Sequence, residues 1–345
     1  MKFALIHDSM AISSYYIKDG TAYAFKGNTF NGHTAVPDKP YTFHHAVSPQ
    51  CYIAMQNLPF IFDDGYYINW NEWDELPDLE LDLIFYGREK SWNSDGSVRW
   101  ERTAEKLRNK YPNALILGWI KELSVGNEIQ NLRRLQDLNN YDGVVTSGVS
   151  SFRFLDVFKN FKQIVNKEFY FISQPVNTEY LFNNFYDNEK TECLYAYIPN
   201  PQQRRGNTEA FVDYLSKKYN IPMRKKELAS GQKFDYLSQK DFIDLWSECS
   251  FHFNLDPFDI QPGNQCMQVA CTGTINLGGH NESHTVLFPD TATCDEKVLE
   301  QKFVEYLEDY DKRSKDIEFA WNKVTEIFGF DNVRKQIKKI ILECK

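Results

Sequence analysis

The chain has 345 residues and a formal net charge of −9 at pH 7. This length exceeds what one hydrophobic core usually organises, so we expect two domains. The acidic balance argues against a dedicated nucleic-acid binder, although the segment 204–233 is locally basic. No apolar run approaches the ~20 residues that a membrane-spanning helix needs. Seven scattered cysteines without a C-x-x-C pair indicate reduced thiols in a cytoplasmic protein.

The first half alternates apolar stretches of strand length with amphipathic helical patterns. This order predicts a parallel sheet with helices on its faces, doubly wound in outline. The segment 20–80 departs from the rhythm because it is rich in Tyr, Gly, Asn, Pro and His, and we expect hairpins or long loops there. The expected strands are 3–7, 81–87, 114–120, 143–148 and 169–173, and the expected helices are 99–112, 127–140 and 150–165.

The second half restarts the same order after a connector over 173–192. Thr208 is the expected N-cap of its first helix, and Gly273 the expected end of a later one. Three amphipathic runs then form a helical tail. The expected elements are a strand at 193–198, a helix at 208–219, a short strand or loop near 234–237, a helix at 238–249, a strand at 250–255, a helix at 264–273, a strand at 274–279, and tail helices at 294–310, 315–328 and 331–344.

The run QVACTGTINLGGHNES, residues 268–283, joins a helix end, a short strand and a double glycine. In this run the chain resembles the donor domain of the GT-B glycosyltransferases, specifically the retaining group 1 or family 4-like branch. That family's pattern is a helix E-A-x-A-x-G, a strand, then G-G and an acidic residue. The matching places are Gln268–Gly273, Ile275–Leu277, Gly278-Gly279 and Glu282.

Three further segments agree with the family in the same order along the chain. They are FYFISQPVNTEYLF, which resembles the interdomain connector, YIPNPQQRRGNTEAFVDYL, which resembles the opening of the donor domain, and YLSQKDFIDLWSECSFHFNLDP, which resembles the helix and strand before the donor loop. The resemblance therefore covers about residues 169–330. The first half matches the family only in its general order of strands and helices.

The resemblance implies a GT-B architecture of two Rossmann-like domains facing a cleft. Residues 1–175, including the irregular 20–80 segment, are assigned to the acceptor side. Residues 176–325 are assigned to a nucleotide-sugar donor domain, and 326–345 to a C-terminal helix of the kind that often packs back on the first domain. The implied activity is that of a hexosyl- or pentosyltransferase, retaining in outcome. It uses a UDP- or GDP-sugar as co-substrate and needs no metal or other cofactor.

The donor diphosphate requires positive charge and free backbone N–H groups. Arg204 and Arg205 offer forked guanidinium groups, and the helix start at Gly263 and Asn264 offers N–H donors and the helix dipole. Each arginine is equally compatible with plain surface exposure. The resemblance places Arg205 at the family's basic phosphate position.

The donor ribose and sugar require hydrogen-bonding partners. The family presents a carboxylate to the ribose where this chain has Gln268, a neutral amide. The family's second Glu, eight residues earlier, is replaced by Ile260. The resulting donor-binding set is Arg204, Arg205, Asp256, Asp259, Gly263, Asn264, Gln268, Gly278, Gly279 and Glu282.

Candidate residues on the acceptor side follow the expected strands of the first half. His7 and Asp8 come directly after the first strand and are the candidate catalytic pair, as a general base or as groups that position the acceptor hydroxyl. Lys121 and Glu122 occupy an equivalent strand end and are the candidate acceptor-binding residues. The alternative for all four is a hydrogen-bonded strand end with no catalytic role.

Two further groups have competing interpretations. His280 and His284 have the spacing of a metal-binding pair, but we expect a loop there without a third ligand, so no metal site is predicted. The aromatic residues Tyr66, Tyr67, Trp70 and Trp73 are expected in the core, and a stacking platform for a sugar or base is the alternative.

The acceptor is either a glycan or modified DNA, as in phage enzymes that glycosylate hydroxylated pyrimidines. The basic 204–233 segment favours DNA, and the net charge of −9 opposes it. A non-catalytic GT-B-like binding or scaffold protein is the alternative from another class, because the usual acidic pair is missing. A nucleotide-sugar epimerase is a further alternative.

Overall fold

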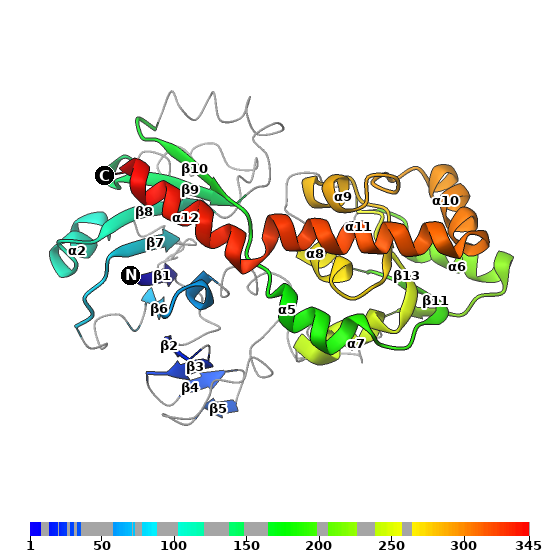
Figure 1. Ribbon diagram of the computed structural model, residues 1–345, viewed down its shortest axis with the longest axis horizontal. Coiled ribbons are helices and arrows are strands. Elements are labelled where there is room, and N and C mark those ends of the chain that lie inside the picture. The colour runs from blue at the N-terminus through cyan, green and yellow to red at the C-terminus, as the bar shows by residue number, and fades with distance from the viewer. Residues whose placement is uncertain are drawn as a thin grey trace, which may run out of the picture. The chain divides into compact units, whose positions relative to one another are not determined.

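The computed structural model describes residues 1–7, 14–19, 21–25, 28–30, 33–35, 58–70, 72, 78–87, 103–120, 138–147, 165–198, 206–225, 239–256 and 264–344. Contacts between residues divide the chain into two compact units (Figure 1). Among the described residues, unit 1 comprises 1–174 and 333–344, and unit 2 comprises Pro175–Asn332. The expected α/β class is confirmed, because both units are built on sheets of mainly or wholly parallel strands.

Unit 1 contains an eight-stranded sheet in the order β10-β9-β8-β7-β1-β6-β2-β3. All of its neighbouring strands are parallel except at β2, which pairs antiparallel with both β6 and β3. The strands are β1 (Lys2–His7), β2 (Tyr15–Lys18), β3 (Thr21–Ala24), β6 (Asp64–Asn69), β7 (Leu83–Gly87), β8 (Leu115–Ile120), β9 (Gly143–Ser147) and β10 (Phe169–Ile172); β4 (Asn28–Phe30) and β5 (His33–Ala35) form a separate hairpin. All five strands expected in this half are present.

Strand β6 lies within the segment where the sequence predicts only hairpins and loops. It pairs with β1 in parallel register over six residues, so this part of the prediction is wrong. Gly65 is needed there because a Cβ atom would lie 1.7 Å from the carbonyl oxygen of Pro59, in the short 3-10 helix η2 (Leu58–Ile61). Tyr67 and Trp70 are buried in or next to the core, as expected for packing rather than for a stacking platform.

Two α-helices and two short 3-10 helices lie in the described part of unit 1. Helix α2 (Thr103–Lys110) contributes Ala104 and Leu107 to the core, and a short 3-10 helix, η4 (Leu138–Asn140), precedes β9. The C-terminal helix α12 (Phe330–Cys344) also belongs to this unit from Val333 onward. Its Gln336 side chain accepts a hydrogen bond from Ser173 N at 2.7 Å and donates one to Ser173 Oγ at 3.1 Å.

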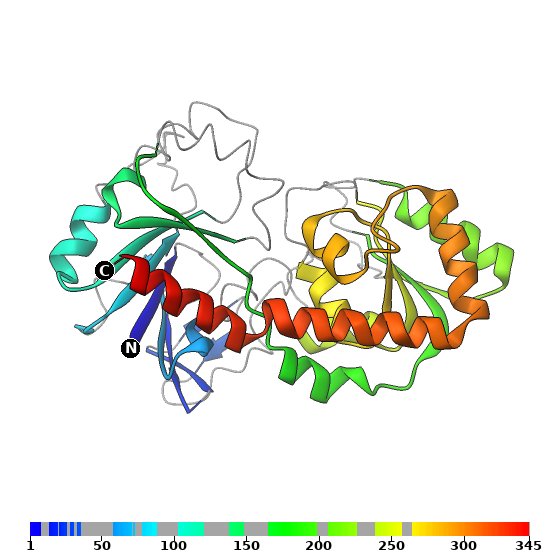
Figure 2. The ribbon, with the colours of Figure 1, turned by 45° about the horizontal axis from the view of Figure 1, so that its top comes forward.

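Unit 2 is built on a four-stranded parallel sheet in the order β12-β11-β13-β14. Helices pack around it, as Figure 2 shows. The strands are β11 (Thr191–Ala196), β12 (Met223–Lys225), β13 (Cys249–Phe253) and β14 (Ile275–Leu277); the helices are α5 (Thr178–Leu181), α6 (Thr208–Tyr219), α7 (Gln239–Ser247), α8 (Asn264–Ala270), α9 (Glu282–Leu287), α10 (Glu296–Glu308) and α11 (Tyr310–Phe328), with a π-helical turn, η5 (Phe182–Tyr186), after α5.

Three local predictions for unit 2 are corrected by the structure. The residues after the double glycine form helix α9 rather than a loop, because the Asn281 side chain caps it by accepting from His284 N at 3.1 Å. The N-cap of α6 is Asn207, and Thr208 instead accepts a hydrogen bond from Leu255 N at 3.0 Å. Strand β12 is additional. The expected strand or loop near 234–237 lies outside the described residues.

Candidate functional site

The loops after β11, β13 and β14 meet at the carboxyl edge of the sheet in unit 2. Gly206, with φ +88°, approaches Leu255 so closely that a Cβ atom would lie 2.0 Å from its carbonyl oxygen. Gly278, with φ +101°, has the same relation to the carbonyl oxygen of Asn254, at 2.4 Å. Both positions therefore require glycine. In open α/β sheets, this carboxyl edge is where ligands bind.

The second glycine of the pair rests on the ring of a buried histidine. Gly279 has φ +75°, and a Cβ atom there would lie 2.7 Å from Cε1 and Nε2 of His284. Burial, together with the nearby His252 and His280, lowers the pKa of His284 to about 3. The imidazole is consequently neutral at physiological pH.

A chain of buried amide and imidazole groups links the glycine loop to the start of α8. Asn276 Nδ2 donates to Gly278 O at 3.1 Å, which turns Asn276 Oδ1 toward Nδ1 of His252 at 2.7 Å. Nδ1 therefore carries the proton of His252, and Nε2 accepts from Gln265 Nε2 at 2.9 Å. Burial lowers the pKa of His252 to about 4, in agreement with a neutral ring. This arrangement leaves Gln265 Oε1 as a hydrogen-bond acceptor.

Helices α8 and α9 contain four buried residues that each have at least one polar side-chain atom without a hydrogen-bond partner within the described part of the chain. They are Gln265 (Oε1), Gln268 (Oε1), Ser283 (Oγ) and His284 (Nδ1 and Nε2), with side chains between 0% and 8% exposed, and we call them the α8–α9 cluster. Leaving a buried polar atom unpaired costs about 1–3 kcal/mol, and native proteins contain few such atoms. Because these atoms lie together on two contacting helices, the α8–α9 cluster is a candidate place for a ligand.

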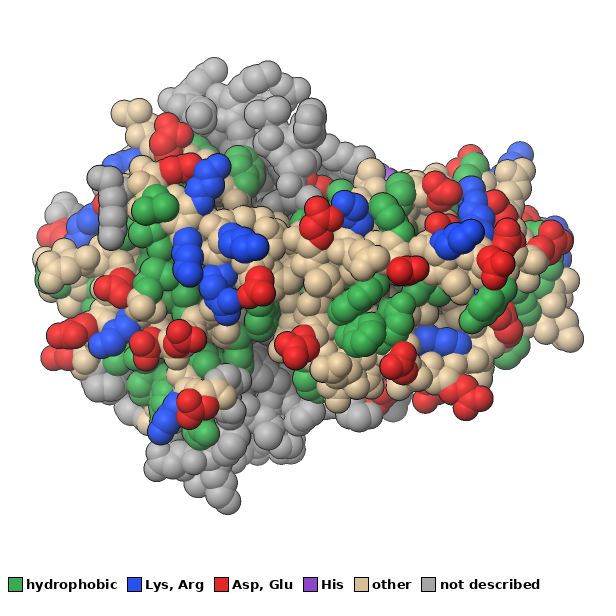
Figure 3. All heavy atoms as spheres, in the orientation of Figure 1, with side chains coloured by type: hydrophobic (Ala, Val, Ile, Leu, Met, Phe, Trp, Pro, Cys, Tyr) green, Lys and Arg blue, Asp and Glu red, His purple; other side chains and the backbone are tan. Residues whose placement is uncertain are grey.

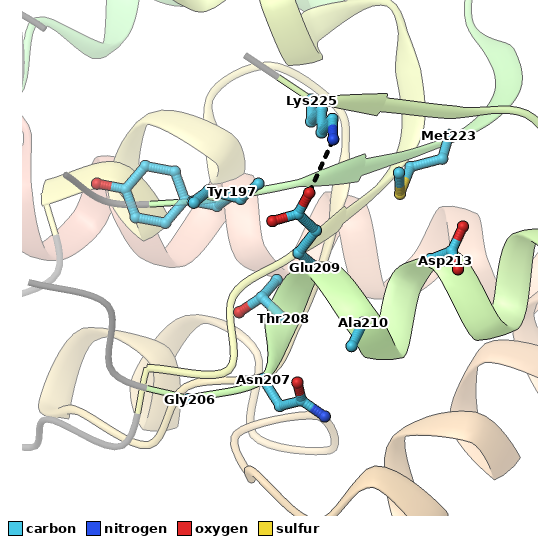
Figure 4. Close-up of a pocket in the computed structure, with 10 residues that line it drawn as sticks. Tyr197, Gly206, Asn207, Thr208, Glu209, Ala210, Asp213, Met223 and Lys225 are labelled. Atoms are coloured by element: carbon cyan, nitrogen blue, oxygen red, sulfur yellow. Dashed lines mark hydrogen bonds and ion pairs between the residues drawn. The ribbon is translucent and has the colours of Figure 1, made fainter. Parts of the chain in front are cut away.

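A cavity of about 390 Å³ opens at the start of α6. Figure 4 shows residues of the β11 end, the first turns of α6 and strand β12 around it, with Lys225 and Glu209 turned toward each other. The Lys225 ammonium lies 2.7 Å from the Glu209 carboxylate. Gly206 lines this cavity and also touches Leu255, so the cavity adjoins the loop that follows β13.

Several residues predicted for the donor site lie along this carboxyl edge. Gly278 and Gly279 form the loop after β14, Glu282 is buried in the first turn of α9, and Gln268 belongs to the α8–α9 cluster. Asp256 follows β13, and its carbonyl oxygen is 3.7 Å from the Cys294 sulfur atom.

Other predicted residues lie wholly or partly outside the described structure. Asn264 begins α8, and His7 ends β1, but only their backbones are described. The remaining predicted residues lie outside the described ranges and are Asp8, Lys121, Glu122, Arg204, Arg205, Asp259 and Gly263.

The predicted histidine pair does not form a described metal site. His280 Nδ1 lies 3.5 Å from the Cys294 sulfur atom, whereas the His284 ring lies under Gly279. No group of three or more His, Cys, Asp or Glu side chains is arranged to hold a metal ion in the described ranges.

Sequence reasoning overlooked His252, Gln265 and the partner of His252, Asn276. A usable signal exists in the strand pattern, because FHF and INL each place a polar residue, His252 and Asn276, directly between two apolar ones. The strands β13 and β14 align in the register that puts His252 directly opposite Asn276. A polar pair facing each other inside a parallel sheet is the mark of a buried hydrogen-bond network.

No protein-family model matches the chain, and no curated protein matches it significantly. Solved structures do match. An alpha-glucosyltransferase (AGT) in complex with UDP aligns over 99% of this chain and 100% of its own, with 11% identity and a TM-score of 0.54. An alpha-glucosyltransferase in complex with UDP-glucose and DNA containing an abasic site aligns over 80% and 85%, with 11% identity and a TM-score of 0.53.

A third matching structure is HepE of Anabaena in complex with UDP, which aligns over 99% of this chain and 100% of its own, at 10% identity and a TM-score of 0.51. Likeness at this level of identity establishes the fold, which is the GT-B glycosyltransferase fold. Within the described residues, no helix is long and apolar enough to cross a membrane.

Proposed function

We propose that the protein is a glycosyltransferase that moves a sugar from a nucleotide-sugar to an acceptor hydroxyl, with the donor bound by unit 2. The observation that carries this proposal is the α8–α9 cluster. These unpaired polar atoms are buried beside a glycine loop at the carboxyl edge of a GT-B sheet. Because all three compared structures contain UDP or UDP-glucose, we propose a UDP-sugar as the donor.

In this proposal different residues of unit 2 bind different parts of the nucleotide-sugar. Gln268 accepts a hydrogen bond from a donor hydroxyl, and the glycine loop allows close approach of the diphosphate to the backbone. Arg204, Arg205 and the helix start at Gly263 and Asn264 stabilise the leaving UDP. The cavity at the start of α6 accommodates the remaining part of the nucleotide.

The reaction breaks the bond between the anomeric carbon and the phosphate oxygen and forms a bond to the acceptor oxygen. The acceptor proton passes to a base, for which His7 and Asp8 are the candidates in unit 1. We propose Lys121 and Glu122 as acceptor contacts on that unit. We propose retention of configuration from the branch that the sequence resembles, and no metal takes part in the proposed steps.

Release of UDP tests this function directly. The protein is incubated with UDP-glucose and a panel of other UDP- and GDP-sugars, and UDP or GDP release is measured together with the shift in thermal unfolding. We expect release from at least one donor and a raised unfolding temperature with UDP. Absence of both for every donor would leave a non-catalytic GT-B-like protein as the better explanation.

Substitutions of Gln268 test its place in the donor site. Gln268→Ala removes the acceptor, and we expect donor affinity to fall about tenfold, while Gln268→Glu keeps an acceptor and retains binding. Tyr111→Phe is a matched control, because it removes a buried hydroxyl that has no hydrogen-bond partner among the described residues of unit 1. Unchanged affinity in both Gln268 variants assigns the residue a structural role.

DNA is the second candidate acceptor, since one compared structure contains DNA. The basic segment 204–233 gives this candidate less support than its composition indicates. All four of its described cations form ion pairs with carboxylates of unit 2. The pairs are Lys217–Asp213, Lys218–Glu300, Arg224–Glu248 and Lys225–Glu209. Figure 3 shows acidic and basic side chains intermixed on the face of unit 2 that it presents.

Helix α12 offers an alternative basic face, on unit 1. Its lysines Lys335, Lys338 and Lys339 are exposed. If DNA is the acceptor and binds this face, Lys338→Glu together with Lys339→Glu weakens DNA binding and reduces its dependence on salt. Lys217→Glu together with Lys218→Glu is the charge-matched control in unit 2. If the α12 variant and the unit 2 control bind DNA equally well, α12 is not part of the DNA interface.

A further inference from the structure

Two cysteines of unit 2 are in contact near the starts of two paired strands. Cys249 is the first residue of β13, and its partner in the register of β11 is Thr191, two residues before Cys193. The register shifts after Thr191, and the two thiols are hydrogen-bonded to each other. Both cysteines are free. Thiols in contact on paired strands need only a local movement to form a disulfide, whose sulfur atoms lie about 2.05 Å apart.

A cavity of about 650 Å³ adjoins this thiol pair and is lined by residues of β11, β12 and α7. Leu245 lines it, and the Leu245 carbonyl oxygen lies 3.9 Å from Cys249 Sγ. Arg224 and Glu248 also line it, form an ion pair at 2.9 Å, and interact electrostatically with both thiols. The side chains of Cys193 and Cys249 are only 1% and 0% exposed. A reagent that reaches them from the cavity therefore has to be small.

The two thiols differ in acidity. The hydrogen bond from the Cys249 thiol, helped by the Thr191 hydroxyl and the Arg224 charge, lowers the pKa of Cys193 against the opposing effect of burial. Thr191 Oγ1 lies 3.3 Å from Cys193 Sγ. The same thiol–thiol hydrogen bond, together with burial, raises the pKa of Cys249. Because the thiolate is the nucleophilic form, Cys193 is the attacking sulfur and Cys249 remains a thiol beside it.

Cys266 and Cys271 provide a contrast within the same unit. They are also buried, at 1% and 0% exposure, but burial alone raises their pKa values. Buried cysteines of this kind behave as small hydrophobic residues. Cys193 and Cys249 have, in addition, each other, a neighbouring guanidinium group and a cavity.

We propose that Cys193 and Cys249 are a redox modification site, a dithiol that hydrogen peroxide oxidises to a disulfide between β11 and β13. The Cys193 thiolate attacks one peroxide oxygen, the O–O bond breaks, and the departing hydroxide takes up a proton to become water. The Cys249 sulfur then attacks the sulfenic acid on Cys193, which forms the S–S bond and releases a second water. The two sulfur atoms lose two electrons, and these reduce the peroxide.

The thiol pair is independent of the proposed donor site. Cys249 begins β13, whereas the glycine loop lies at the carboxyl edge of the same sheet. A dithiol reductant reverses the oxidation by thiol–disulfide exchange. The modification can therefore be measured without a donor, an acceptor or glycosyltransferase activity.

Peptide mapping of the full-length protein after peroxide treatment tests the site. The reduced protein is treated with hydrogen peroxide near neutral pH, its remaining thiols are alkylated, and its peptides are analysed by mass spectrometry. We expect two peptides joined through Cys193 and Cys249, which dithiothreitol separates, while Cys266 and Cys271 are recovered alkylated. Absence of the joined peptides overturns the proposal, whether Cys193 stays reduced or is oxidised further. Equally fast oxidation of Cys266 also overturns it, because peroxide then enters by general unfolding.

Substitutions of the two cysteines test their separate roles. In Cys249→Ser the second sulfur is missing, so we expect Cys193 to remain a sulfenic acid that dimedone captures. In Cys193→Ser we expect Cys249 to stay unreacted, because it keeps its proton. Cys249→Ala replaces the serine variant if serine prevents folding. Equal dimedone labelling of the native protein and the Cys249 variant contradicts attack by Cys249 on the sulfenic acid and overturns the proposal.

Arg224→Gln tests the contribution of the neighbouring charge. Loss of the guanidinium disfavours the Cys193 thiolate, so we expect disulfide formation to slow about threefold, and Arg224→Lys to restore most of the rate. Arg108→Gln is the matched control, since it removes an arginine that pairs with Asp142 at 2.7 Å in unit 1, and it leaves the rate unchanged. An unchanged rate in Arg224→Gln contradicts attack by a Cys193 thiolate.

Discussion

The two units differ in the kinds of side chain that are buried in their sheets. The described core of unit 1 is mainly aliphatic and aromatic, with Ile6, Ile84 and Ile116 packed along three adjacent strands. In unit 2, polar residues such as His252 and Asn276 occupy the interior of the two strands nearest the glycine loop. Buried polar groups weaken a core unless a network or a ligand satisfies them. We therefore expect the interior of the unit 2 sheet to contribute less stability per buried residue than that of unit 1.

The glycine loop offers the strongest way to break unit 2 selectively. In Gly278→Ala the new Cβ atom meets the carbonyl oxygen of Asn254 and must adopt a positive φ angle, so we expect a loss of about 4 kcal/mol in the free energy of unfolding. Urea unfolding measures this loss. The control is Gly143→Ala in unit 1, where the new atom meets mainly the side chains of Tyr170 and Leu117. An equal, small loss in both variants contradicts the close-approach argument.

Lowering the pH is a second way to destabilise unit 2, because the folded state holds His252 and His284 neutral. Their pKa values are lowered to about 4 and about 3, against 6.5 for an unperturbed histidine. Below pH 6.5 the unfolded chain binds protons that the folded chain does not. The free energy of unfolding therefore decreases as the pH is lowered, down to about pH 4 for His252 and about pH 3 for His284. We expect about 3 kcal/mol from His252 alone across this window. Unfolding measured from pH 7 to pH 4 checks it, and His284→Phe reduces the slope.

Substitutions that shorten a core side chain test whether the two units unfold independently of each other. Ile337→Val in α12 removes one buried methylene group from unit 1, and Ile243→Val in α7 does the same in unit 2. Each costs about 1 kcal/mol of stability. Because a bound ligand protects the unit that binds it, we expect UDP to raise the unfolding temperature of unit 2 in both variants. UDP protection confined to unit 1 reverses the assignment of the donor site.

The smallest expected effect concerns the surface charges of unit 2. The Lys217–Asp213 pair on α6 is formed by exposed side chains at i,i+4 spacing. Asp213→Asn should cost only about 0.3 kcal/mol and leave UDP affinity unchanged, although Asp213 lines the cavity at the start of α6. A several-fold change in UDP affinity would place this rim of the cavity in contact with the nucleotide.

Much of the fold was predictable, because a long segment with regular hydrophobic periodicity indicates whether it is a helix or a strand. Helix α6 matches its expected range, and the strands β1, β8 and β13 lie within one or two residues of theirs. Strand β6 was missed because glycine, asparagine and tyrosine obscure its alternation, although tertiary contacts place it beside β1. Helix α9 has only six residues and little helical pattern, so its Asn281 cap decides its formation.

The site was predictable only where a motif carries it. The double glycine and Gln268 follow from the pattern that the chain resembles. His284, Gln265 and His252 are polar residues that a single sequence assigns to the surface by default, and only the packing of α8, α9 and β13 shows that they are buried. Their chemistry depends on which atoms face one another, which the sequence does not specify.

The chain passes from one unit to the other near Gln174 and returns near Asn332. The two crossing segments are joined, since Val176 N donates to Phe328 O at 2.9 Å and Val176 pairs with Gly329 in a parallel bridge. A single proteolytic cut near Gln174 therefore leaves only α12 of unit 1 covalently attached to unit 2, and residues 1–174 are then held only by non-covalent packing, including the Gln336–Ser173 hydrogen bonds. Among the described residues, unit 1 comes from stretches on both sides of unit 2, so expressing it alone requires joining 1–174 to 333–344 by a new linker.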